Sequence, residues 1–167
     1  MSAGTWVTDS ASVAETIDLG RRLGAAARPG DAVALVGELG SGKTHLAKGM
    51  AEGLGAARAR EVTSPTFVLC HEFPDGRIPF YHLDAYRLRG SADLSAIGAE
   101  EMLEGDGLAA LEWADRAPET LPDDCMRVRL EVTGPESRRL TLTAGGPRSA
   151  RLLAATRSGA RSASSCG

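Results

Sequence analysis

The first third of the chain alternates between short apolar runs and amphipathic stretches. The run "AVALV", Ala32 to Val36, is continuous and has the length of a strand, as expected for a strand buried on both faces of a sheet. Before it, "SVAETIDLGRRLGAAA" has an approximate apolar face at helical spacing, and Ser12 and Glu15 are spaced as in a capping box. "THLAKGMAEGLG" predicts a second helix that ends near Gly55, and "TWVT" at 5–8 predicts a short strand.

The rest of the chain is mostly a series of strand-like runs. "PDG", Pro74 to Gly76, is a hairpin-turn signal between the first two runs. "SADLSAIGAEEMLEG" at 91–105 predicts one or two short helices. Helical and hairpin connections together predict an α/β fold of three layers, in which helices flank a mixed parallel and antiparallel sheet. The strand-like runs are "TFVLCHEF", "RIPFYHLDAY", "LAALEW", "MRVRLEV" and "RRLTLTA".

Composition restricts the class of protein. The chain has 167 residues, of which 43% are hydrophobic and 25% charged, which is ordinary for one globular domain. No apolar run approaches the roughly 20 residues of a membrane helix, and no signal-peptide pattern opens the sequence. The three cysteines are far apart and form no C-x-x-C pair, so we expect free thiols, no zinc site and a cytoplasmic location.

Charge is distributed unevenly along the chain. The segment at 145–167 holds four arginines and no acid, which leaves an acidic body and a basic end in a chain of net charge −3. This segment is rich in Gly, Ser, Ala and Arg and poor in large apolar residues, a composition typical of disorder. We therefore predict a single domain at 1–144 and a basic, disordered tail at 145–167.

The candidate chemistry begins directly after the apolar run at 32–36. "GELGSGKT", Gly37 to Thr44, has the G-x-x-x-x-G-K-T spacing of a phosphate-binding loop. Its glycines allow the backbone N–H groups to curl around a phosphate, and the following helix adds the positive end of its dipole. Lys43 can reach the outer phosphates, and the Thr44 hydroxyl can bind Mg²⁺. A glycine-rich turn with a surface lysine does not explain this strand–loop–helix context.

A bound magnesium–nucleotide also needs carboxylates near the end of a buried strand, because Mg²⁺ prefers oxygen ligands. Asp84 ends "PFYHLD", and Glu112 ends "LAALE". Each acid taken alone is more often a solvated residue at a strand end. The adjacent Lys43 and Thr44 favour a role for both acids, since such a site requires them.

Four segments in this order resemble the TsaE family, also called YjeE, of bacterial P-loop ATPases needed to make threonylcarbamoyladenosine in tRNA. The segments are "GELGSGKTHLAKGMAEGLG", "TSPTFVL", "FYHLDAYRL" and "LEWADR". The resemblance covers about residues 8–145, and it implies a P-loop NTPase-like fold with ATP and Mg²⁺ as cofactors. Glu38 stands where the family often has Asp.

The resemblance also implies roles for individual residues. Thr44 and Glu112 match the Mg²⁺ ligands, and Asp84 matches an acid that is catalytic or supports the site. "TSPTF", Thr63 to Phe67, resembles a switch loop beside the outer phosphate, so Thr66 joins Lys43, Asp84 and Glu112 as a catalytic candidate. The residues expected to contact the nucleotide are Glu38, Leu39, Gly40, Ser41, Gly42, Lys43, Thr44, His45 and Arg138.

Other residues keep more than one interpretation. Trp113 is either a core aromatic or a neighbour of the acid that the resemblance assigns to the metal. For Arg138, a surface arginine on a strand face is the simpler interpretation than a contact with the nucleotide. Tyr86 and Arg87 could position the loop after Asp84 or contact a partner. His71 and His82 are interpreted as strand residues without chemistry.

Three functions compete for this sequence. The resemblance implies an ATPase that binds the TsaB and TsaD proteins and reaches tRNA indirectly through them, without a membrane. A small-molecule P-loop kinase is the alternative, but "YRLRGSADL" would make a poor lid. A GTP-binding switch would need an N/T-K-x-D guanine motif, which the sequence lacks.

Overall fold

The computed structural model describes residues 4–63, 70–86 and 91–164. Seven strands form one sheet in the order β1-β7-β6-β2-β5-β4-β3. The four central strands β6, β2, β5 and β4 run parallel. β7 pairs antiparallel with β6 and β3 with β4, and β1 pairs antiparallel with β7 at the edge of the sheet. The strands are β1 (Thr5–Ser10), β2 (Ala32–Val36), β3 (Cys70–Phe73), β4 (Phe80–Asp84), β5 (Leu108–Glu112), β6 (Met126–Val132) and β7 (Arg138–Ala144).

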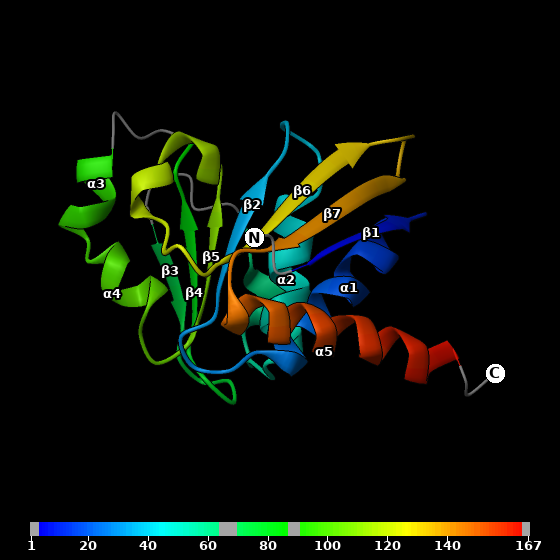
Figure 1. The fold of residues 1–167 in the computed structure, drawn as a ribbon, viewed down its shortest axis with the longest axis horizontal. Helices are drawn as coiled ribbons and strands as arrows, with labels where there is room; N and C mark the ends of the chain where they lie inside the picture. The colour runs from blue at the N-terminus through cyan, green and yellow to red at the C-terminus, as the bar shows by residue number, and fades with distance from the viewer. Residues whose placement is uncertain (1–3, 64–69, 87–90, 165–167) are drawn as a thin grey trace.

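Helices lie on both faces of this sheet (Figure 1). The three short 3₁₀ turns are η1 (Ala59–Glu61), η2 (Ala114–Arg116) and η3 (Pro118–Thr120). The fold is thus the mixed α/β, three-layer arrangement that the sequence predicts. The α-helices are α1 (Val13–Ala26), α2 (Lys43–Gly53), α3 (Ser91–Ala96), α4 (Ala99–Leu103) and α5 (Pro147–Ser164).

Strand β2 separates two apolar cores because successive side chains of a strand point to opposite faces. Val33 and Leu35 pack into the larger core with α1, α2 and α5, whereas Ala32 and Ala34 pack into the smaller core with α3 and α4. Residues 32–35 are all buried, as the continuous apolar run predicts. β2 is the middle strand of the sheet, and the glycine loop begins at its carboxyl end.

Helices α1 and α2 pack backbone against backbone. A Cβ atom added to Gly20 would lie 2.2 Å from the carbonyl oxygen of Leu46, and one added to Gly49 would lie 2.0 Å from that of Ile17. Only glycine allows this approach. The capping box at the start of α1 forms as predicted, since the Ser12 hydroxyl accepts from the N–H of Glu15 and the Glu15 carboxylate accepts from the N–H of Ala11.

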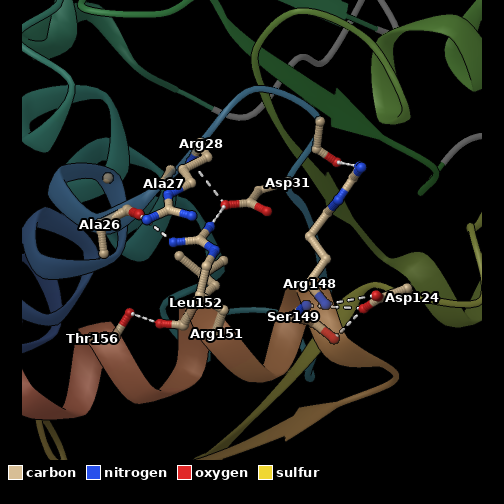
Figure 2. A network of polar contacts seen from close by, with 12 residues as sticks. Ala26, Ala27, Arg28, Asp31, Asp124, Arg148, Ser149, Arg151, Leu152 and Thr156 are labelled. Carbon is tan, nitrogen blue, oxygen red and sulfur yellow. Dashed lines mark hydrogen bonds and ion pairs between the residues drawn. The ribbon is translucent and has the colours of Figure 1, made fainter.

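The prediction of a disordered segment after residue 144 was wrong for 147–164, which form helix α5. Leu152 and Leu153 are buried in the larger core. The carboxylate of Asp124 caps the start of the helix by accepting from the N–H groups of Arg148 and Ser149, at 2.8 and 2.9 Å (Figure 2).

The arginines of α5 explain why the composition of this segment wrongly predicted disorder. Arg151 Nη2 lies 2.7 Å from the buried carboxylate of Asp31, and Arg148 Nη1 donates to the carbonyl of Gly30 (Figure 2). Two of the four arginines are therefore paired with the turn before β2 instead of being solvated. Small residues between them bring the helix close enough to bury its two leucines. Among the described helices none is long and apolar enough to cross a membrane.

Candidate phosphate-binding and metal site

The glycine loop connects the end of β2 to the start of α2 in a conformation that needs glycine. Gly40 and Gly42 have φ angles of 80° and 102°, in the left-handed region. A Cβ atom on Gly37 would lie 2.5 Å from Ser41 Oγ and 2.7 Å from the carbonyl oxygen of Leu130. The spacing of the glycines in the sequence thus corresponds to three separate backbone requirements.

A cavity of about 160 Å³ opens at the amino-terminal end of α2. The first turn of a helix directs N–H groups without intrahelical partners outward, which favours an anion at this position. Glu38 does not line this cavity; it lines a second cavity of about 300 Å³ between the loop and β6. The lining residues of the first cavity are Leu39, Gly40, Ser41, Gly42, Lys43, Thr44, His45, Glu112 and Trp113.

The ammonium group of Lys43 lies inside the loop. Nζ donates to the carbonyl oxygens of Gly37 and Glu38, at 2.6 and 2.9 Å. It also lies 4.1 Å from the ring centre of Trp113, a cation–π distance. Burial lowers the pKa of Lys43, and the carboxylates of Glu112 and Asp84 partly oppose this shift. The cation is thus held beside the cavity by groups of the loop itself.

The structure brings Thr44 and Glu112 together, although 67 residues separate them in the sequence. Thr44 Oγ1 lies 3.0 and 3.2 Å from the two carboxylate oxygens of Glu112. Because β5 pairs in parallel with β2, its last residue reaches the same edge of the sheet as the glycine loop. The two side chains that the resemblance assigns to Mg²⁺ thus bring their oxygen atoms together beside the cavity.

His82 completes this group, and sequence reasoning missed it. Its side chain is fully buried on β4, and Nε2 lies 2.5 Å from Glu112 Oε2. Nδ1 is buried too and has no partner among the described residues. The available signal was strand periodicity, since His82 stands two residues before Asp84 and therefore on the same face of β4.

Asp84 lies beside Glu112 at the ends of paired strands, where the two residues are in register. Its side chain is only 7% exposed, and Oδ1 accepts from the N–H of Tyr86 at 2.8 Å. Burial raises the pKa of Asp84, and the negative charge of Glu112 adds to this effect, while the Tyr86 hydrogen bond opposes it. Asp84 is not among the residues that line the cavity, but it lies next to Glu112, which does.

Trp113 follows Glu112 in a strained conformation. Its φ of 57° is the only positive value of a non-glycine residue in the described ranges. The ring centre lies 4.9 Å from that of Tyr86 and 5.3 Å from the guanidinium carbon of Arg116. Trp113 is half-buried and lines the cavity next to Glu112, so it contributes to the wall of the candidate site as well as to packing.

Arg138 contacts the glycine loop, and it does not line the cavity. Its guanidinium donates to the carbonyl oxygens of Gly40 and Ser41, both at 3.0 Å. Two further bonds reach the carbonyls of Gly134 and Ser137 in the turn between β6 and β7. The arginine therefore lies on the side of the loop to which the carbonyls of Gly40 and Ser41 point. Thr66 falls outside the described residues.

The two oxygen groups of Thr44 and Glu112 suit Mg²⁺ better than they suit a metal that takes all of its ligands from the protein. Within the described ranges, no group of three or more His, Cys, Asp and Glu residues could hold a metal ion. Thr44 and Glu112 offer two oxygen ligands beside a cavity that fits phosphates, and Mg²⁺ is usually bound by one or two carboxylates together with phosphates and waters. The site therefore matches an ion that would arrive with a nucleotide.

Comparison with known proteins now identifies the family. Residues 10–140 match the family model "Threonylcarbamoyl adenosine biosynthesis protein TsaE". The chain belongs to the TsaE family. The matched residues include the glycine loop, Asp84, Glu112 and Arg138, and they end before α5. Membership connects the chain to threonylcarbamoyladenosine biosynthesis in tRNA.

Individual TsaE proteins are similar over most of their length. The chain is 40% identical to the tRNA threonylcarbamoyladenosine biosynthesis protein TsaE of Bacillus subtilis over 134 residues, which is 80% of this chain and 82% of that one. Identity to the protein of that name from Streptomyces coelicolor is 42% over 138 residues, covering 78% and 91%. The crystal structure of Bacillus subtilis YdiB superposes with a TM-score of 0.78 at 32% identity, covering 94% of this chain and 96% of that one.

Proposed function

We propose that this TsaE-family protein is a Mg²⁺-dependent ATPase that binds the TsaB–TsaD complex and hydrolyses ATP to support threonylcarbamoyladenosine formation. The contact between Thr44 and Glu112, beside Lys43 and the amino-terminal end of α2, is the observation that carries the proposal. These groups supply the phosphate donors, the cation and the metal ligands that ATP hydrolysis needs.

The loop and Lys43 bind the phosphates in this proposal. The backbone N–H groups at the start of α2 hold them, and the Lys43 ammonium, beside the cavity, neutralises the charge of the outer phosphate. In the structure the ammonium donates to the carbonyls of Gly37 and Glu38, and in the proposal a phosphate takes their place.

Thr44 and Glu112 would hold the metal through the hydroxyl oxygen and the carboxylate oxygens that lie together beside the cavity. When bound, Mg²⁺ supplies positive charge at the outer phosphates. His82 keeps the Glu112 carboxylate at the edge of the cavity through its short contact with Oε2. Asp84 orients the attacking water, because burial makes its carboxylate a better proton acceptor than an exposed one.

The partner assignment is based on the family. Relatives from several bacteria are named tRNA threonylcarbamoyladenosine biosynthesis proteins, which supports the proposal that the ATPase cycle serves a tRNA-modifying complex. TsaB and TsaD are the partners that we propose, with the chemistry on the base performed by them and tRNA reached through them.

The test is ATP hydrolysis by the purified protein in a Mg²⁺ titration, with and without purified TsaB and TsaD. We expect phosphate release that depends on Mg²⁺ and increases with both partners present. Lys43→Ala should remove it while the circular-dichroism spectrum stays unchanged. Undiminished hydrolysis by folded Lys43→Ala would contradict the site, and phosphoryl transfer to a small acceptor without water hydrolysis would favour a kinase.

A further inference from the structure

Four carbonyl groups surround the guanidinium of Arg138, at the start of β7. Nε donates to the Ser41 carbonyl, Nη2 to that of Gly40, and Nη1 to those of Gly134 and Ser137, all within 3.0 Å. An arginine has five N–H donors, so four of them are used in these bonds. The charge thus connects the glycine loop to the β6–β7 turn and is not left for a ligand.

The orientation of two peptide groups follows from these contacts. The described chain contains no cis peptide, and in a trans peptide the N–H points opposite to the carbonyl. The bond from Arg138 to the Ser41 carbonyl therefore directs the N–H of Gly42 away from the guanidinium. Gly42 lines the cavity at the end of α2 and is the N-cap of that helix.

The neighbouring peptide is held in the same way. The carbonyl of Gly40 bonds to Arg138, and the N–H of Ser41 on the other side of that peptide donates to the carbonyl of Glu38 at 3.0 Å. Gly40 and Gly42 both have positive φ angles, and glycine, which has no Cβ atom, moves easily between these and negative values. Without an external partner, such a loop would sample many conformations.

We infer that Arg138 is a positioning residue, which orders the glycine loop for phosphate binding before any ligand arrives and acts through the backbone of Gly40 and Ser41. This inference rests on the proposed nucleotide site, and it differs from the sequence-based expectation that Arg138 contacts the nucleotide. Holding the Ser41 carbonyl on a cation also polarises its peptide, which strengthens the N–H of Gly42 as a donor to an anion.

The fork geometry makes lysine a poor substitute. Nε and Nη2 bond to two successive carbonyls of the loop at the same time, whereas an ammonium is a single point charge on a flexible stem. Arg139 offers a matched control, since it is the next residue on β7 and its exposed guanidinium pairs with Asp9 at 3.0 Å. Removing it eliminates a charge of the same sign from the same strand without touching the loop.

The experiment compares Arg138→Ala, Arg138→Lys and Arg139→Ala with the unchanged chain. Amide hydrogen exchange of Ser41 and Gly42 is measured without nucleotide, and ADP binding is measured by titration calorimetry. We expect faster loop exchange and a Kd raised at least about tenfold in both Arg138 variants, the size expected for losing charge-assisted hydrogen bonds. The binding stoichiometry should stay unchanged, and Arg139→Ala should match the unchanged chain in every measurement.

Three results would overturn the inference. A raised Kd with unchanged loop exchange would mean that Arg138 contacts the nucleotide directly, and Arg138→Lys with normal exchange and affinity would mean that charge alone suffices. A lower stoichiometry at normal Kd would show a merely structural role and would overturn it as well. If the unchanged chain fails to bind ADP, the proposed function fails, while the exchange comparison still decides whether Arg138 orders the loop.

Discussion

His82 Nε2 lies 2.5 Å from Glu112 Oε2, and both side chains are almost completely buried. The same carboxylate accepts from the Thr44 hydroxyl, so one acid connects a histidine of β4 to the first turn of α2. Partners behind a ligand fix its orientation, and replacing them typically weakens metal binding. The histidine is thus part of the candidate metal site even though it does not line the cavity.

His82→Gln should raise the Mg²⁺ concentration needed for half-maximal ADP binding by roughly 10-fold, because Glu112 loses the partner that fixes its rotamer. Titration calorimetry at several Mg²⁺ concentrations measures the shift. His71→Gln is the matched control, since His71 is paired with His82 across β3 and β4 and is partly exposed. An equal shift in the two variants would contradict a specific role of His82.

Glu112→Gln and Asp84→Asn should have different kinetic effects. We expect Glu112→Gln to raise the Mg²⁺ needed for half-maximal ATPase, because a hard cation loses a charged ligand. Asp84→Asn should lower the maximal rate by about 10²-fold with a smaller change in Mg²⁺ demand, since a proton acceptor governs turnover more than binding. The opposite pattern in a Mg²⁺ titration of the two variants would make Asp84 the direct metal ligand.

Asp84→Asn should also change stability in a pH-dependent way. Because burial raises the pKa of Asp84, the folded state binds more protons than the unfolded state between the ordinary and the raised pKa. The contribution of Asp84 is fully present below its ordinary pKa and is lost as the pH rises through the folded value. We therefore expect Asp84→Asn to melt at a higher temperature than the unchanged chain at pH 7, with a difference that shrinks near pH 4. Thermal unfolding of the nucleotide-free protein at both values measures it, and a variant that melts lower at pH 7 would refute the prediction.

Helix α5 should contribute to global stability. Asp124→Ala removes the cap of the helix and should cost about 0.5–2 kcal/mol in the free energy of unfolding. Truncation after Gly145 should cost more, because it also uncovers the core around Leu152 and leaves Asp31 without Arg151. Urea denaturation followed by circular dichroism measures both effects, with Asp123→Ala as the control for Asp124. A truncated chain of unchanged stability would show that α5 is dispensable for the fold.

The central part of the fold was predictable because its signals are local. The continuous apolar run at 32–36 indicates a strand buried on both faces. The glycine spacing after it indicates a loop with left-handed backbone conformations. The ends of β4 and β5 could be recognised because Asp84 and Glu112 interrupt apolar runs. Parallel pairing then brings both acids to the same edge as Thr44.

The missed features depend on partners that are distant in sequence. Helix α5 is stabilised by Asp124, which accepts from its first N–H groups, and by Asp31, which pairs with Arg151. The composition of the segment does not reveal either partner. The contact of His82 requires the register of β4 against β5. Arg138 could be placed near the loop by resemblance, but only the geometry shows that it holds carbonyls instead of facing the cavity.

The order of the strands has a consequence for synthesis on the ribosome. β1, the first strand to emerge, is hydrogen-bonded to β7, the last strand of the chain. The amino-terminal strand therefore stays unpaired while nearly the whole domain is translated, and so does the Asp31 carboxylate that awaits Arg151. The central parallel strands can pack against the first helices earlier, but β1 can join the sheet only after β7 has been made. A nascent chain arrested before β7 should thus expose an apolar edge that chaperones recognise.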